Sequence, residues 1–218
     1  MLKSTTMRDL RQQIGREEFD YPALISSLSG YANPRDKVTR LLRRGDIIRV
    51  KKGLYVFGEA LRRRPFSREV LANLIYGPSF ISLDSALSFH GMIPERVDTV
   101  TSVTTKRPKA FITPVGSFIY RRTPRAYFHL GMDRVEGGDV AFLIAVPERA
   151  LADKIRDDRG HALRNESDVA RYLFDDLRID REAFARLDSG FLATIAAAAG
   201  SRKIAICVHL LRRVKGEA

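Results

Sequence analysis

A basic run between Asn33 and Phe57 has the composition and spacing to bind a polyanion. It reads NPRDKVTRLLRRGDIIRVKKGLYVF. Lysine and arginine bind the phosphates of nucleic acid, and arginine also pairs with the major-groove edge of guanine. The residues with the type and position for such contacts are Lys37, Thr39, Arg40, Arg43, Arg44, Lys51 and Lys52.

These seven residues fall into two groups by their position along the run. Lys37 and Arg40 lie in the first turns of a predicted helix, where a recognition helix reaches base edges. Thr39 fits a thymine methyl group or a phosphate. The four cations that follow come late in the helix or in the next turn, so we expect them to contact phosphates, which set position rather than sequence preference.

The first half of the run predicts a short amphipathic helix. Asn33 is a residue type that caps helix N-termini. Val38, Leu41 and Leu42 then follow the i, i+3, i+4 spacing of one apolar stripe. Gly45 comes where a helix end favours a residue without a Cβ.

The second half predicts a β-hairpin, because IIRV and LYVF are joined by KKG. Two further helices are predicted upstream, over residues 7–14 and 22–28, the second preceded by Phe19 as a staple residue and Asp20 as an N-cap. Three helices and a basic hairpin in this order predict a winged helix-turn-helix. A solvated cationic helix that precedes a hairpin by chance is the alternative.

The charge of the chain is concentrated in the same region. Residues 1–66 hold 15 lysines and arginines against seven acidic residues, within a total net charge of +12. Such a patch indicates a DNA or RNA partner.

Cys207 is the only cysteine, so no intrachain disulfide is possible. With no apolar signal core and no run of roughly 18 apolar residues, we expect a cytoplasmic protein without a membrane partner.

The whole pattern predicts an α+β protein. We expect a winged helix-turn-helix domain over residues 1–65 and a second domain over 66–218, mixed α/β to residue 160 and helical from 161. Strands are predicted at 97–105, 109–114, 115–122, 126–130 and 139–146, the last as a buried central strand. Helices are predicted at 68–76, 83–89, 147–157, 166–177, 181–187, 190–199 and 202–214.

Catalytic motifs are incomplete in this chain. Gly116-Ser117 resembles the start of a nucleotidyltransferase motif, but no D-x-D or D-x-E pair follows. Asp98 and Lys106 bracket a strand as in restriction-like nucleases, but the middle acid is missing. The four histidines lack metal-ligand spacing. We therefore predict a protein that is not an enzyme and that uses neither a metal nor a cofactor.

Several segments occur together in an order that is specific. They are RLLRRGDIIRVKKGLYVFG, YGPSFISLDSALSFHGMIPERV, TSVTT, GSFIYRR and AVPERALADKI. Over about residues 20 to 158, the chain resembles the AbiEi-type antitoxins of bacterial abortive-infection (type IV) toxin–antitoxin systems. Ser82, Ser85, His90 and Lys154 recur in the matching segments.

The resemblance implies two linked roles. The winged helix would bind double-stranded DNA at inverted repeats in its own promoter and repress transcription. The second domain would neutralise a nucleotidyltransferase-like toxin, without a stable complex. Two alternatives remain: a transcription factor whose second domain senses a ligand or a protein partner, and a nuclease or nucleotidyltransferase.

Overall fold

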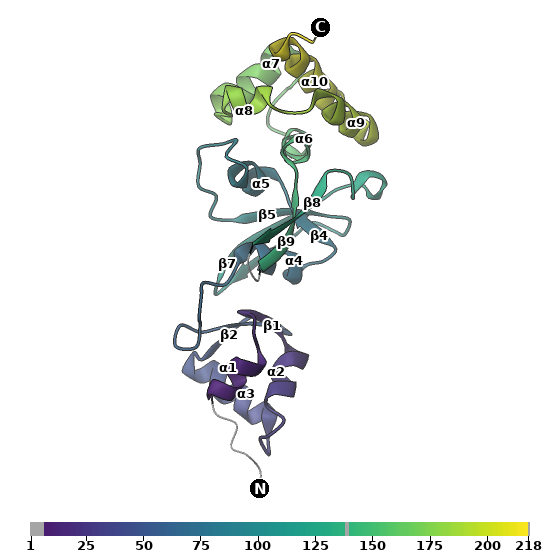
Figure 1. Ribbon diagram of the computed structural model, residues 1–218. Helices are drawn as coiled ribbons and strands as arrows, with labels where there is room; N and C mark the ends of the chain where they lie inside the picture. The colour runs from purple at the N-terminus through teal and green to yellow at the C-terminus, as the bar shows by residue number, and fades with distance from the viewer. Residues whose placement is uncertain (1–6, 138–139, 218) are drawn as a thin grey trace.

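The computed structural model describes residues 7–137 and 140–217, and its class is the predicted α+β. One sheet has three strands in the order β1-β3-β2, and a second has six in the order β6-β7-β5-β4-β9-β8. The molecule is elongated, with the first helices at one end, the large sheet in the middle and the last helices at the other end (Figure 1). None of the helices in the described residues has the length and apolar character needed to cross a bilayer.

The N-terminal part has the element order of a winged helix-turn-helix. Its elements are α1 (Met7–Gln13), β1 (Glu18–Asp20), α2 (Tyr21–Ser27), α3 (Pro34–Arg44), β2 (Ile47–Lys51) and β3 (Leu54–Phe57). Asp20 caps α2 as predicted, since its Oδ1 accepts the amide of Ala23 at 2.9 Å. Phe19 lies in β1, a strand that was not predicted. The centre of its ring lies 4.6 Å from the centre of the Phe57 ring.

The large sheet is mixed. Its strands are β4 (Ser79–Ile81), β5 (Val100–Thr104), β6 (Lys109–Thr113), β7 (Gly116–Arg122), β8 (Met132–Gly137) and β9 (Val140–Ala145). The pairs β5–β7 and β4–β9 are parallel and the others antiparallel. The apolar run predicted as a central strand is β9, an interior strand between β4 and the edge strand β8.

Helices cover both faces of this sheet. Helix α4 (Arg68–Ile75) lies on the side of the winged helix, and α5 (Leu83–Phe89) and α6 (Pro147–Asp157) lie on the other side (Figure 1). Beyond α6 come α7 (Glu166–Arg171), the π-helical turn η2 (Tyr172–Asp176), α8 (Arg181–Ala185), α9 (Ser189–Ala199) and α10 (Arg202–Lys215). The helix predicted over 166–177 is therefore α7 continued by η2.

The strand predicted at residues 126–130 is wrong. The segment forms a 3₁₀ turn, η1 (Arg125–Tyr127), and the strand comes later as β8. The carbonyls of Tyr127 and Leu130 turn inward and accept hydrogen bonds from the guanidinium of Arg149 at 2.7 and 2.6 Å. They are therefore engaged by a buried cation rather than by a neighbouring strand.

Two apolar cores meet at the hairpin formed by β2 and β3, which we call the wing. Tyr55 and Phe57 belong to the core of the N-terminal helices. Val50, Leu54 and Val56 belong to the core of the large sheet and the C-terminal helices. The predicted boundary between residues 65 and 66 follows the wing, so the second core begins before that boundary.

Candidate nucleic-acid interface

Helix α3 is held by one apolar stripe and leaves the rest of its surface to solvent. Val38 and Leu41 are buried on the N-terminal core. The helix ends at Gly45, whose φ of 73° is left-handed and whose amide meets the carbonyls of Leu41 and Leu42. Asn33 stands at the N-cap position, as predicted, but its side chain makes no capping hydrogen bond. Burial of the stripe thus fixes which residues face outward.

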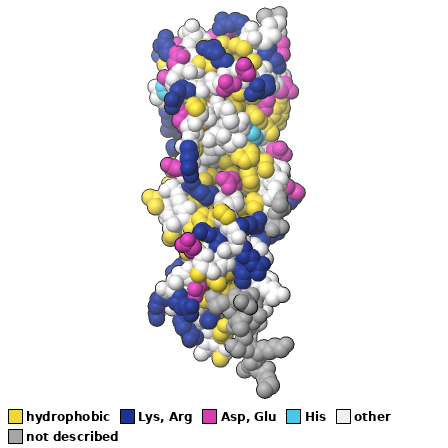
Figure 2. Space-filling view, turned by 60° about the vertical axis from the view of Figure 1, so that its left-hand side comes forward, with side chains coloured by type: hydrophobic (Ala, Val, Ile, Leu, Met, Phe, Trp, Pro, Cys, Tyr) yellow, Lys and Arg dark blue, Asp and Glu magenta, His cyan; other side chains and the backbone are white. Residues whose placement is uncertain are grey.

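The predicted contacts on α3 do face outward. Thr39, Arg40, Arg43 and Arg44 are exposed, and Lys37 is partly exposed. In Figure 2, two clusters of Lys and Arg side chains lie in the lower part of the molecule, where the winged helix lies, and further ones lie over the upper part. Within residues 7–137 and 140–217, Arg40 and Arg43 form no ion pair. Two exposed guanidinium groups without an acidic partner suit an anionic ligand.

The other predicted residues of α3 have intramolecular partners. The ammonium of Lys37 lies 4.7 Å from the centre of the Tyr31 ring. The hydroxyl of Thr39 donates to the carbonyl of Arg35 at 3.2 Å. Arg44 pairs with Asp46 at 3.2 Å, although its side chain stays 68% exposed. Exposed ion pairs of this kind are weak, so Arg44 remains available to a phosphate.

The two lysines of the wing have different surroundings. Lys52 is exposed at the turn. Lys51 instead donates to the carbonyl of Ile75 at the end of α4. Burial lowers the pKa of Lys51, and the nearby charges of Lys106 and Lys109 lower it further. Lys51 thus links the wing to α4, and in this it differs from the six other predicted residues.

Two exposed arginines in the same region were not among the predicted contacts. Arg35 lies in the first turn of α3, and Arg49 lies in β2. Arg49 is the exposed residue between the partly buried Ile48 and the buried Val50. The alternation of apolar and polar residues in IIRVK was the signal for it.

The segment that connects the two parts is tied to β1. Residues 58–66 lie between the wing and α4. A carboxylate oxygen of Glu17 accepts the amide of Arg63 at 3.2 Å, and Glu18 accepts the amide of Ser67. Burial raises the pKa of Glu18, and the hydrogen bond from Ser67 opposes this rise. The connection is therefore anchored by two acidic side chains of the winged helix.

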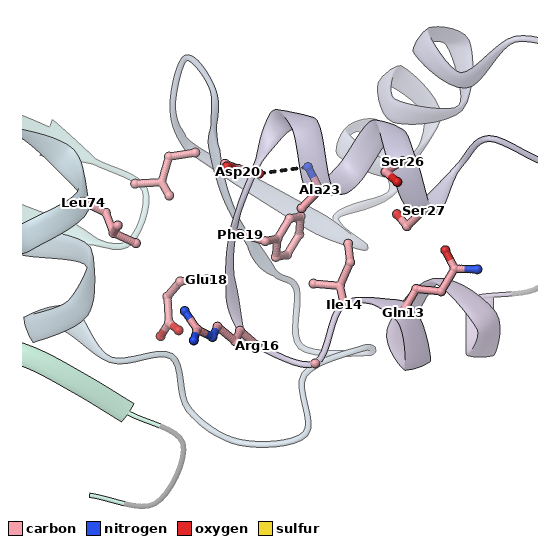
Figure 3. A pocket seen from close by; sticks show the side chains of 12 residues that line it. Gln13, Ile14, Arg16, Glu18, Phe19, Asp20, Ala23, Ser26, Ser27 and Leu74 are labelled. Atoms are coloured by element: carbon pink, nitrogen blue, oxygen red, sulfur yellow. Dashed lines mark hydrogen bonds between the residues drawn. The ribbon is translucent and has the colours of Figure 1, made fainter. Parts of the chain in front are cut away.

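A cavity of about 670 Å³ lies where the winged helix meets α4. In Figure 3, Leu74 reaches toward it from α4, while Ile14 and Phe19 approach from the winged helix. Its polar lining consists of Gln13, Arg16, Glu18, Asp20, Ser26 and Ser27. The volume is in the range of small-molecule sites.

The residues that recur with the AbiEi segments have structural partners. The hydroxyl of Ser82 donates to Asp153 at 2.8 Å and does not cap α5. Ser85 also makes no such cap: its hydroxyl donates to the carbonyl of Thr99. His90 lies 2.7 Å from the carbonyl of Ala145. Lys154 pairs with Asp84 at 2.7 Å. No cluster of three or more potential metal ligands occurs in the described part of the chain.

Comparisons with known proteins give a likeness of fold. No family model matches the chain, and no curated protein matches it. The crystal structure of the RV2827C protein from Mycobacterium tuberculosis is similar, with a TM-score of 0.63 and 16% sequence identity. The similarity covers 99% of this chain and 77% of the other. At this identity the likeness extends to the fold and no further.

Proposed function

We propose that this protein binds double-stranded DNA through α3 and the turn of the wing. The observation that carries the proposal is the outward face of α3, where Arg40 and Arg43 are exposed and have no acidic partner among the described residues. In a winged helix-turn-helix this is the helix that enters the major groove. The local excess of cations supplies the sequence-independent part of the affinity.

The contacts divide between bases and phosphates. Lys37 and Arg40 lie early in α3 and are proposed to read base edges, with Thr39 beside them. Arg43, Arg44 and Lys52 are proposed to contact phosphates. The ammonium of Lys51 is engaged with α4, so we assign it to positioning the wing.

The biological role that we propose is that of an AbiEi-type antitoxin. The N-terminal part would repress its own promoter at inverted repeats, and the rest of the chain would neutralise a nucleotidyltransferase-like toxin. This assignment is supported by the ordered series of segments between about residues 20 and 158. Direct contact with the toxin is not required by it.

A gel shift tests the DNA-binding proposal. The probe is the duplex just upstream of the gene, and random duplex is added as competitor at two salt concentrations. We expect a complex that survives the competitor and weakens as salt rises. A complex that the competitor abolishes would leave only a generic basic surface, and the autorepressor role would fall. Rescue of cells from the neighbouring toxin gene tests the antitoxin role separately.

A second candidate is a regulator whose DNA binding responds to a small ligand. The cavity at the junction favours it, because a ligand there would touch both Phe19 of the winged helix and Leu74 of α4. Thermal shifts on addition of a metabolite panel test this candidate. A shift that Leu74→Ala abolishes, with no rescue from the neighbouring toxin, would favour a sensor over an antitoxin.

A further inference from the structure

Helix α9 lies at the surface, and its exposed side carries mainly small residues, with Thr194 as an exposed polar one. Its sequence, SGFLATIAAAA, contains no charged residue. Leu192 and Ile195 are buried, whereas Ala197 and Ala198 are exposed. Surface helices normally carry charged or polar residues on the side away from the core, and helices that are apolar all round are normally covered. Apart from Thr194 and the first turn, the exposed side of α9 lacks polar and charged residues, which is the composition of a surface that a partner covers.

A groove of about 420 Å³ runs between α9 and α10. Small side chains leave this space open, among them Ala193 and Ala197 of α9 and Ala205 of α10. Gly200, which joins the two helices in a left-handed conformation with φ 58°, closes one end. A groove between two helices with an apolar floor is the shape that accepts the apolar face of a third helix.

The charged residues at the edge of the groove are two arginines, Arg202 and Arg212. Arg202, His209 and Arg212 line it, and no acidic residue does. Among the residues that the structure describes, none of these three forms an ion pair. A second copy of this chain would bring the same cations to the groove and a net charge of +12 with them. Charge complementarity therefore favours an acidic partner over self-association.

We propose that the groove between α9 and α10 binds an amphipathic helix of another protein, with acidic residues beside its apolar anchors. Alanine and valine side chains at the floor would contact the anchors, and Arg202 and Arg212 would face the acids. The groove lies at the opposite end of the molecule from α3 (Figure 1), so both can be occupied together. The proposal goes beyond DNA binding and does not depend on it.

Binding of designed peptides to the full-length protein tests the proposal. One labelled peptide of about 18 residues, long enough to form a helix, places leucines at i, i+3, i+4 and i+7 and glutamates elsewhere. A second peptide has lysine in place of every glutamate, and a third is a scrambled acidic peptide without an apolar face. Fluorescence anisotropy should show binding of the first peptide and little of the other two.

Two matched pairs of variants locate the binding. Ala197 lines the groove, whereas its exposed neighbour Ala198 does not. Ala197→Gln should raise the Kd of the acidic peptide by about tenfold or more, as for a central anchor position, and Ala198→Gln should leave it unchanged. Reversing Arg202 and Arg212 to glutamate should weaken binding, whereas reversing Arg40 and Arg43 on α3 should not. Circular dichroism checks that each variant is folded.

Four results would overturn the proposal. The acidic and basic peptides could bind alike, or both alanine variants could behave alike. Loss of binding only in the α3 variant would show that the acidic peptide binds the DNA-binding face instead. A concentration-dependent dimer in sedimentation, abolished by Ala197→Gln, would assign the groove to a second copy of the chain and would also refute an acidic partner.

Discussion

The guanidinium Nε of Arg149 lies 2.9 Å from Oδ2 of Asp153, and neither side chain is more than 1% exposed. The same guanidinium donates to Thr123 as well as to the carbonyls of Tyr127 and Leu130. This buried cation on α6 therefore holds the segment around η1 that precedes β8.

Arg149→Met should destabilise the protein by about 3–5 kcal/mol, because it leaves the buried Asp153 carboxylate with only the more distant Arg156, at 3.9 Å, as a counter-charge. Urea unfolding measures the change. Arg134→Ala is a control, since Arg134 pairs with Glu136 at 2.8 Å on the surface and such pairs contribute less than about 1 kcal/mol. Similar losses in the two variants would refute the role assigned to Arg149.

Gly58→Ala should destabilise the end of α3. A Cβ at Gly58 would lie 1.8 Å from the carbonyl oxygen of Gly45, which terminates that helix. The backbone must move to relieve the overlap, at a cost of about 1–3 kcal/mol or more. Gly15→Ala is the matched control, because nothing lies within 4 Å of its Cβ position. Thermal unfolding of the two variants compares them, and equal melting temperatures would contradict the prediction.

Arg40→Ala and Lys52→Ala should weaken DNA binding in different ways. Loss of Arg40 should cost about 1–3 kcal/mol on the specific site and relax the preference at one base pair. Loss of Lys52 should weaken all duplexes alike and reduce the salt slope by about 1. Titrations with specific and random DNA at several salt concentrations distinguish the two. Arg186→Ala is the control, because Arg186 is exposed and lies among the distant C-terminal helices. Equal effects of both variants on both DNAs would refute the division of roles.

Asp158 should make stability depend on pH under acidic conditions. Burial alone would raise its pKa, but hydrogen bonds from the amide and ring of His161 and from Tyr172 outweigh burial and lower the pKa to about 2, from 3.8. A carboxylate with a depressed pKa stabilises the fold above its unfolded value. That contribution should be lost as the pH falls from 3.8 toward about 2.

The free energy of unfolding as a function of pH measures this effect. Asp158→Asn should flatten the dependence in that window, and His161→Ala should shift its midpoint to higher pH. Asp133→Asn, at an exposed position of β8, should leave the profile unchanged. An unaltered profile in Asp158→Asn would show that another group controls acid unfolding.

Local signals made α3 and the wing predictable from sequence. The apolar stripe, Gly45 and the two β-rich runs act over a few residues, and the structure confirms the helix and the hairpin. Strands β1 and β4 have three residues each, which is too short for an alternating pattern to be recognised. The contact of Lys51 with Ile75 joins residues 24 positions apart, so no local pattern could reveal it.

The wing packs against both cores, one on each side. This limits how parts of the protein can be exchanged with other proteins. Val50, Leu54 and Val56 would lose their apolar neighbours if the first 65 residues were moved to another protein. A transplanted winged helix would then carry an uncovered sheet face and tend to aggregate. Grafting DNA specificity onto this chain is better done by exchanging the outward residues of α3, which leaves the shared hairpin in place.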